Sequence, residues 1–337
     1  MIALLLSGLL WAAGHRVIHE GETIEQIARE LGYDAKELRA LNALAARGAV
    51  PVGTVLQLPT EGVVRAQKAR VLSVTGRGRI TTPDGEVLEL ECGRWMEPGT
   101  TICTSVESYA TIQLAKEDAG AHFDDIRLSS STCLTVVSAA SGEGQRSSLV
   151  NLSEGSVQVD RPSDAGGLIT VQTPVSLTTA EGGSFRVTLE EDAARTEALT
   201  ENVVVMAAGA EVSLEAGEGS RVSRDTAPTA PVPLLDTGFL LKPDNDAALI
   251  RPDFAWTPVE AALGYRIQIA TSPDFSRILY QEDIPYPEWR PEFLLLPYDV
   301  PALWWRISSF DRFGFESPPS SPRRLTVPTQ LRAAEAP

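Results

Sequence analysis

Apolar residues recur at helical spacing in one part of the chain, residues 15–60. Four of them lie at positions i, i+3, i+4 and i+7 and predict an amphipathic helix: Ile24, Ile27, Ala28 and Leu31. Thr23 before this run and Gln26 three residues later form a capping-box pattern, and Gly32 follows as a helix stop. A second short helix is predicted over residues 34–44, and strand-like pieces flank the pair. The pattern predicts a small β-α-α-β module.

Beyond residue 64 the spacing changes to an alternation of apolar and polar residues. Segments 110–114 and 184–189 alternate in this way and are rich in β-branched side chains. Turn signals such as Pro83-Asp84-Gly85 interrupt the alternation at intervals typical of antiparallel sheets. We therefore predict an all-β domain over residues 64–224.

A proline-rich stretch separates this domain from the rest of the chain. Residues 225–233 predict an extended, semi-rigid linker. Alternation resumes over residues 234–328, a length that suits an immunoglobulin-like sandwich. Residues 329–337 lack periodicity and are predicted to be a frayed tail. The predicted fold class is multidomain, with a small α+β module followed by two all-β domains.

Residues 1–14 have the pattern of a secretory signal peptide. Their apolar run is too short to span a bilayer and ends in the small residues Ala12, Ala13 and Gly14. No Lys or Arg precedes the run, so either the α-amino group supplies the positive charge or the true start lies upstream. The alternative is a buried N-terminal strand or helix. We expect export to the periplasm or cell envelope, and no other stretch of the sequence predicts a transmembrane span.

Composition supports several folded domains and limits the partners. The chain has 337 residues, more than one hydrophobic core usually holds, and 43% of them are hydrophobic. Its formal net charge is -16 at pH 7. A chain this acidic has no general attraction for phosphate backbones or anionic lipids. We therefore expect neither a nucleic acid nor a membrane surface as the main partner.

The cysteines are Cys92, Cys103 and Cys133, all within the predicted 64–224 domain. An odd number leaves at least one thiol unpaired in the monomer, and the sequence does not choose among the three pairs. One disulfide beside a buried thiol, and three buried thiols that act as small apolar residues, are both consistent with the pattern. The spacing does not fit a zinc site.

Candidate catalytic and metal-binding residues are few. The three histidines are scattered, and the sequence has no nucleophile elbow, zinc-protease motif or nucleotide-binding loop. The run His122-Phe123-Asp124-Asp125 is interpreted as a polar loop between strands rather than as a metal site. A carboxylate pair that cleaves glycans is kept as an alternative. We expect no catalytic residues, no metal, no cofactor and no enzyme activity.

The module at residues 15–60 resembles a LysM domain along its whole length. The matching positions follow the order of the family: Gly21-Glu22-Thr23-Ile24, Ile27-Ala28, Gly32, Leu38, Asn42, Val50-Pro51-Val52-Gly53 and Leu56-Gln57-Leu58-Pro59. Arg16 departs from the pattern, because the family often has an aromatic residue there. The resemblance implies recognition of glycans that contain N-acetylglucosamine, above all peptidoglycan.

The same resemblance implies a glycan site between two loops. One loop carries Gly21, Glu22, Thr23 and Ile24, and the other carries Ala49, Val50, Pro51 and Val52. Main-chain groups at a helix N-terminus can hydrogen-bond an acetamido group, and small apolar residues can accept its methyl group. The alternative is that Thr23 only caps the helix and that Ile24 and Val50 only pack.

The predicted 64–224 domain resembles the extracytoplasmic β domain of FecR-like proteins. Short pieces match in order and spacing: residues 97–104, 152–159, 171–174, 183–187 and 214–218. The FecR regulators also have a transmembrane helix and a cytoplasmic segment that binds a sigma factor, and we find neither in this sequence. The resemblance therefore implies a fold and a scaffold or protein-contact role, without site residues.

Residues 234–328 resemble a fibronectin type III-like domain. The expected core residues are Trp256, with Tyr265 and Ile267 opposite Trp305 and Ile307. Trp289 and Trp304 are either packed residues or a stacking platform for sugars.

Together these features predict an exported, non-catalytic protein of the bacterial cell envelope. The N-terminal module is expected to bind peptidoglycan, and the β domains are expected to form a spacer or docking scaffold. The alternative is a sensor or assembly scaffold whose main partner is another envelope protein.

Overall fold

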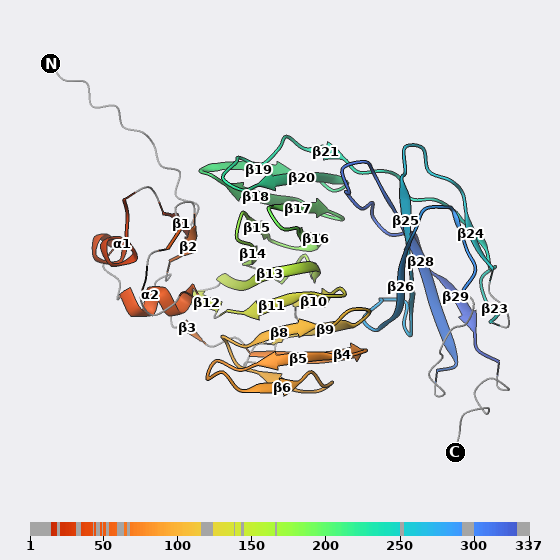
Figure 1. Ribbon diagram of the computed structural model, residues 1–337, viewed down its shortest axis with the longest axis horizontal. Helices are drawn as coiled ribbons and strands as arrows, with labels where there is room; N and C mark the ends of the chain where they lie inside the picture. The colour runs from red at the N-terminus through yellow and green to blue at the C-terminus, as the bar shows by residue number, and fades with distance from the viewer. Residues whose placement is uncertain are drawn as a thin grey trace.

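The computed structural model describes residues 15–18, 21–31, 35–42, 44, 48, 50–51, 54–58, 64–65, 68–115, 124–137, 139–142, 145–165, 167–249, 253–291 and 300–328. These residues form an N-terminal, a middle and a C-terminal unit, which lie in a row along the longest axis of the molecule (Figure 1). The predicted signal peptide and the predicted tail lie outside the described residues.

The N-terminal unit has the predicted β-α-α-β order. Its elements are β1 (His15–Val17), α1 (Ile24–Leu31), α2 (Ala35–Leu41) and β2 (Val55–Gln57). The two strands pair antiparallel, with Arg16 opposite Leu56. The buried side chains beneath the helices are Ile18, Ile24, Ile27, Ala28, Leu38, Leu56 and Leu58. Ile24, Ile27 and Ala28, which belong to the apolar face predicted from helical spacing, are therefore part of this core.

The middle unit contains two β-sheets that share the long strand β13 (Gln145–Arg161). In order, sheet I holds β7 (Trp95–Met96), β4 (Lys68–Thr75), β9 (Tyr109–Ala115), β10 (Asp124–Leu128), β13, β16 (Gly183–Leu189), β17 (Ala193–Ala198), β20 (Glu218–Ser223) and β21 (Val232–Pro233). Sheet II holds β6 (Val87–Glu89), β5 (Gly78–Thr81), β8 (Thr101–Thr104), β11 (Cys133–Val136), β13, β14 (Leu168–Gln172), β15 (Leu177–Ala180), β18 (Val203–Ala207) and β19 (Ala210–Leu214). Two short strands, β3 (Val64–Arg65) and β12 (Ala139–Gly142), pair with each other, and β12 also pairs with β13. The pairings close the strands into one barrel.

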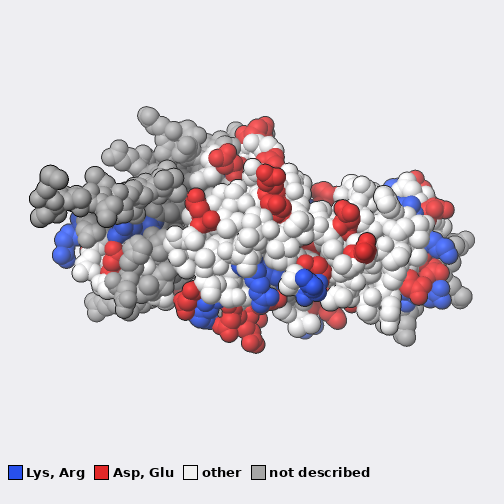
Figure 2. All heavy atoms as spheres, turned by 90° about the horizontal axis from the view of Figure 1, so that it is seen from above, with Lys and Arg blue, Asp and Glu red and all other residues white. Residues whose placement is uncertain are grey.

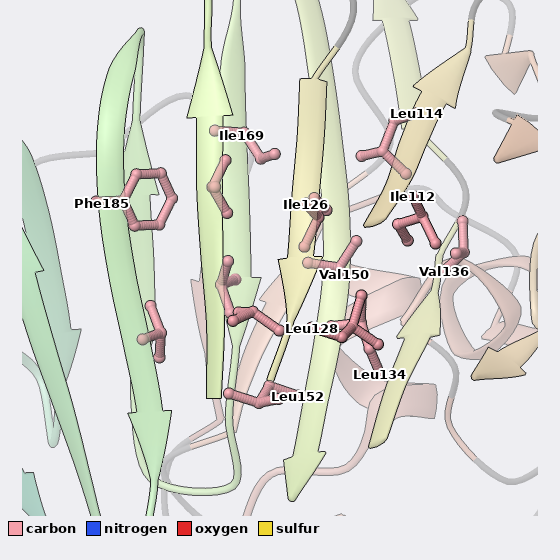
Figure 3. Packing of buried hydrophobic residues seen from close by; sticks show 14 of the residues in the cluster. Ile112, Leu114, Ile126, Leu128, Leu134, Val136, Val150, Leu152, Ile169 and Phe185 are labelled. Atoms are coloured by element: carbon pink, nitrogen blue, oxygen red, sulfur yellow. The ribbon is translucent and has the colours of Figure 1, made fainter. Parts of the chain in front are cut away.

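The core of the middle unit lies between its two sheets. Figure 3 shows Ile126 and Leu128 of β10 among side chains from β9, β11 and β13. Alternate residues of β10 are buried, so Asp125 and Arg127 point to the other face of sheet I. This alternation is the pattern that predicted strands from the sequence, and it places a row of polar side chains on the outer face of sheet I.

Asp124 and Asp125 correct the interpretation of residues 122–125 as a polar loop. Both aspartates belong to β10, whereas His122 lies outside the described residues. Asp124 is buried and forms an ion pair with Arg161 at 2.6 Å. A buried carboxylate of this kind is stabilised by its cationic partner, and Asp124 therefore has a structural role.

The C-terminal unit has two sheets around one core. The smaller sheet holds β22 (Leu240–Lys242), β24 (Phe254–Trp256) and β27 (Glu288–Trp289). The larger sheet holds β23 (Ala247–Ala248), β29 (Arg323–Thr326), β28 (Ala302–Phe310), β25 (Gly264–Ala270) and β26 (Ile278–Ile284). This is the all-β sandwich that the sequence predicts.

The expected core aromatics of the C-terminal unit are buried. Trp256 packs edge-on against Tyr265, with ring centroids 5.5 Å apart. Ile267 lies opposite Ile307, as predicted. The other expected pair differs, because Trp305 lies opposite Ile269 and Tyr265 lies opposite Ser309.

The predicted linker at residues 225–233 lies along the edge of sheet I. Val232 in β21 pairs with Gly219 of β20. Thr229 N donates to the carbonyl oxygen of Arg221 at 2.9 Å, and Leu234 N donates to that of Gly217 at 2.8 Å. These hydrogen bonds fasten the segment between the two units to the middle unit. The domain boundaries themselves stay predictions.

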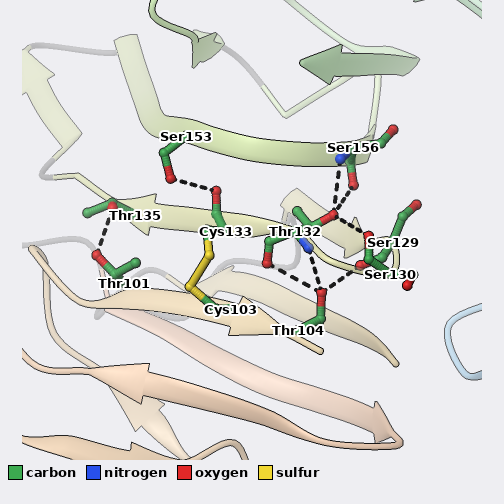
Figure 4. The surroundings of a disulfide bond; sticks show 10 residues. All are labelled: Thr101, Cys103, Thr104, Ser129, Ser130, Thr132, Cys133, Thr135, Ser153 and Ser156. Atoms are coloured by element: carbon green, nitrogen blue, oxygen red, sulfur yellow. Dashed lines mark hydrogen bonds between the residues drawn. A yellow bond between two sulfur atoms is a disulfide. The ribbon is translucent and has the colours of Figure 1, made fainter. Parts of the chain in front are cut away.

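Cys103 and Cys133 form a disulfide, which resolves the choice left by the sequence (Figure 4). The two residues lie directly opposite each other on β8 and β11. The expectation that the unpaired thiol is buried is wrong, because the free thiol of Cys92 is exposed and donates to the carbonyl oxygen of Leu72 at 3.0 Å.

Charged side chains are spread over the surface. Figure 2 shows Asp and Glu over the middle and C-terminal units, with Lys and Arg among them. In the part of the chain that the structure describes, no helix is long and apolar enough to cross a bilayer.

Candidate functional site

The first predicted site loop leads into α1 and is shaped by Gly21 and Thr23. Gly21 has φ +84, and the space around a Cβ atom at this position is open. Thr23 caps the helix, because Gln26 N donates to Thr23 Oγ1 at 3.2 Å and Thr23 N donates to Gln26 Oε1 at 3.0 Å. The predicted capping box is confirmed. Gly21 and Thr23 are both exposed, so a ligand can reach them.

Ile24, the last of the predicted site residues in this loop and the first residue of α1, has a side chain that packs inside the module. It is only 1% exposed and packs in the core of the N-terminal unit, together with Leu38 and Leu56. A ligand at this position would therefore meet the main chain of Ile24 and not its side chain.

The second predicted site loop precedes β2. Val50 is half-buried and packs against the core cluster of the N-terminal unit, to which Ile24 also belongs. Pro51 is exposed, and its carbonyl oxygen accepts from Thr54 Oγ1 at 2.7 Å. Ala49 and Val52 lie outside the described residues.

Arg39, which the sequence analysis did not select, connects the parts of this site. It is buried on α2, and its guanidinium donates to Glu25 Oε1 on α1 at 2.8 and 3.0 Å. The same group donates to the carbonyl oxygen of Gly48 at 2.9 Å. Arg39 therefore ties the second loop to the first helix. In the sequence, Arg39 is only a polar residue next to Leu38 on a short amphipathic helix. This pattern does not show which residues the arginine contacts.

The charges near the two loops are compensated. Arg16 pairs with Glu22 at 2.5 Å, and Arg39 pairs with Glu25 at 2.8 Å. The hydrogen bond from Arg39 is the main reason why the pKa of Glu25 lies below its usual value. A surface with small exposed residues and paired charges suits a neutral polar ligand better than an ion.

The two tryptophans considered as a sugar platform are packed in the C-terminal unit. Trp289 contacts Phe254, with ring centroids 5.3 Å apart. Trp304 is partly buried and packs against a cluster that includes Tyr109 of sheet I and Phe275 of the C-terminal unit. The structure supports the packing alternative for both side chains.

A second polar region, also missed from the sequence, lies where the C-terminal unit docks on sheet I. Thr111 Oγ1 and Ser73 Oγ both donate to the carbonyl oxygen of Ser276, at 2.6 and 2.5 Å. Thr75 Oγ1 donates to the carbonyl oxygen of Ile278 at 2.5 Å. The outward-facing hydroxyl groups of β4 and β9 thus hold the loop before β26.

Glu316 is the centre of the charged part of this interface. Its carboxylate accepts from Arg266 of its own unit at 2.6 Å and pairs with Arg186 of β16 at 3.3 Å. Ser308 Oγ donates to the same carboxylate at 2.5 Å. Its main-chain N–H donates to Glu197 on β17 at 3.4 Å. The outer face of sheet I therefore contacts the C-terminal unit through a buried network of charged side chains.

Comparison with known families finds two domains. The LysM domain matches residues 17–59, and the FecR protein family matches residues 100–205. Comparison with the curated proteins gives no match.

Solved structures give distant likenesses. Two crystal structures of a candidate anti-sigma factor from Parabacteroides distasonis ATCC 8503 are 18% identical, with TM-scores of 0.33 and 0.32. Each match covers 40% of this chain and 59% of that chain, so the aligned part spans less than two thirds of the related structure. The FN1-FN3 domains of chicken CNTN1 are 10% identical, with a TM-score of 0.22, over 79% of this chain and 97% of that chain. At these values the likenesses carry no argument about function.

Proposed function

Because the chain carries a LysM domain followed by a FecR domain, we propose that it is a non-catalytic protein of the bacterial cell envelope. The LysM domain binds peptidoglycan or a related glycan that contains N-acetylglucosamine. The middle and C-terminal units form a scaffold behind it. Residues 1–14 direct export to the periplasm or envelope, and the activity needs no cofactor.

The observation that supports glycan binding most is that the two predicted site loops have exposed residues, while the charges beside them are paired. Gly21, Thr23 and Pro51 are exposed, and the nearby Glu22 and Glu25 are neutralised by arginines. Main-chain groups at the start of α1 suit an acetamido group, and the small side chains let a sugar ring approach. One shallow site gives weak binding, so firm attachment to a wall depends on many sugar repeats in the polymer.

A second function, contact with another envelope protein, is favoured by exposed apolar side chains on the middle unit. Val87 of β6 is 63% exposed and Trp95 of β7 is 55% exposed. Large exposed apolar groups are candidates for protein contact. In this alternative the middle unit, which contains the FecR match, mediates the contact, and the protein acts as a sensor or assembly scaffold.

Glycan binding is tested by titrating soluble N-acetylglucosamine oligomers into Gly21→Leu and Gly85→Leu variants of the whole protein. Both glycines have left-handed backbones, with φ +84 and +91, and open space at the Cβ position. The substitutions therefore strain the backbone similarly, but only Gly21 lies in the predicted site. We expect Gly21→Leu to weaken binding about tenfold or more, and Gly85→Leu to leave it unchanged.

Melting curves of the two variants check that both remain folded. Equal affinities of both variants and the unchanged protein would contradict the proposed site. Absence of oligomer binding by the unchanged protein would contradict glycan recognition itself and favour the protein-contact alternative.

A further inference from the structure

Arg306 of β28 lies at the interface between the C-terminal unit and sheet I. The residues two positions before and after it share its face of the strand and show where that face points. Trp304 packs against the cluster that contains Tyr109 of sheet I, and Ser308 donates to Glu316 in the interface network. Arg306 therefore faces sheet I, and it is only 9% exposed.

The contacts of Arg306 within the described part of the chain include no carboxylate. Its Nε atom donates to the neutral Gln268 Oε1 at 2.8 Å. Its guanidinium stacks on Phe275, with Cζ 3.9 Å from the centroid of the ring. Neither contact uses the two Nη atoms, which form no hydrogen bond with the described residues and still touch solvent. An external acceptor can therefore reach them.

The neighbouring charges do not compensate this cation. Arg127 and Arg186 of sheet I lie near Arg306, and so do the carboxylates of Asp160 and Glu316. Both carboxylates are already engaged, because Asp160 pairs with Arg127 at 2.6 Å and Glu316 pairs with Arg186 at 3.3 Å. Among these five side chains one positive charge is left over, and it belongs to Arg306.

The environment of Arg306 disfavours its charge. Burial lowers its pKa to about 9, and Arg127 and Arg186 contribute to the lowering. The group is still charged at pH 7, so an added anion would relieve the repulsion. The planar fork of a guanidinium matches two oxygen atoms of a carboxylate or phosphate group. Because donors in an enclosed place normally have an acceptor, the Nη atoms point to one from outside the chain.

We infer that this interface binds a small oxyanion, whose carboxylate or phosphate group accepts hydrogen bonds from the Nη atoms of Arg306. Arg127 and Arg186 attract the same anion from sheet I. Since both units supply cations, the bound anion favours the docked arrangement of the C-terminal unit. The limited exposure of Arg306 admits only a small group. This site lies on other units than the LysM domain and does not depend on glycan binding.

The test is a calorimetric titration of the whole protein at pH 7 and constant ionic strength, with inorganic phosphate and with acetate in separate runs. We expect binding of at least one of them, and the tighter one identifies the preferred group. Arg306→Gln should weaken this binding about tenfold or more, because the charged hydrogen bonds are lost. Arg306→Lys keeps the charge but not the planar fork, and it should bind about threefold more weakly.

Melting curves of the variants check that they remain folded and give a second readout. The tighter-binding anion should raise the melting temperature of the unchanged protein, since it binds the docked state, and should not raise that of Arg306→Gln. An equal rise in both proteins would contradict a site at Arg306.

Arg79→Gln serves as the matched control. Arg79 of β5 is an exposed arginine of sheet II that forms no ion pair with the described residues. This variant should bind the anion as the unchanged protein does. The inference is overturned if neither phosphate nor acetate binds the unchanged protein. It is also overturned if Arg79→Gln weakens binding as much as Arg306→Gln, since that result indicates only general attraction between the anion and surface cations.

Discussion

Glu316 illustrates how single residues join the units of this protein. Burial on its own raises the pKa of this carboxyl. Arg186, Arg266 and the hydrogen bond from Ser308 lower it, and the net pKa lies below the usual value. The carboxylate is therefore charged near neutrality and holds two arginines from different units. Removing such a group leaves buried cations without their partner.

We predict that Glu316→Ala lowers the free energy of unfolding by about 3 kcal/mol, because Arg186 and Arg266 lose their shared partner. Urea denaturation followed by tryptophan fluorescence measures the change. Glu211→Ala, at an exposed carboxylate, should stay within about 0.5 kcal/mol of the unchanged protein. Equal stability of the two variants would show that the Glu316 network does not stabilise the fold.

Local residue relations could be predicted from the sequence, and distant ones could not. The Thr23–Gln26 cap was predictable because its partners are three residues apart on one helix. The contact of Arg39 with Gly48 and the pairing of Arg186 with Glu316 depend on how separate segments pack. The helical spacing also placed Ile24 on the buried face, whereas the LysM resemblance selected it as a site residue.

Strands β8 and β11 are paired and are also joined by a disulfide. Cys103 and Cys133 lie opposite each other, and Thr101 and Thr135 form a hydrogen bond at 2.8 Å on the same strand pair (Figure 4). The disulfide closes a segment with a sequence separation of 30 residues. A cross-link of this length restricts the unfolded chain and thereby stabilises the folded one.

We predict that Cys103→Ser lowers the free energy of unfolding by about 3 kcal/mol, because the unfolded chain regains the freedom of the closed segment. Cys92→Ser is the matched control, since this thiol is free and exposed. Chemical denaturation of both variants without reductant measures the difference. An equal effect of the two substitutions would contradict a stabilising cross-link between β8 and β11.

The strands were easier to predict than their order. Alternation of apolar and polar residues predicts elements such as β9 and β16, because one face of each strand must be buried. It does not reveal that β13 runs through both sheets or that β21 joins the edge of sheet I. These features depend on pairing between segments that are distant along the chain.

The N-terminal unit, which is proposed to bind the glycan, lies apart from the interface between the middle and C-terminal units. The LysM unit lies at one end of the molecule and the C-terminal unit at the other, with the stacked strands of the middle unit between them (Figure 1). The docked interface carries hydrogen bonds and a buried charge network, so the middle and C-terminal units are expected to move as one body. A glycan bound by the LysM unit would leave that interface undisturbed.

The central claim is that the N-terminal unit attaches the protein to peptidoglycan. Co-sedimentation with insoluble peptidoglycan tests it most directly, with the whole protein beside a chain that lacks residues 15–59. We predict that the whole protein sediments with the polymer and that the shortened chain stays in solution. Equal sedimentation of both would place the binding on the β units, and failure of both to sediment would contradict peptidoglycan binding.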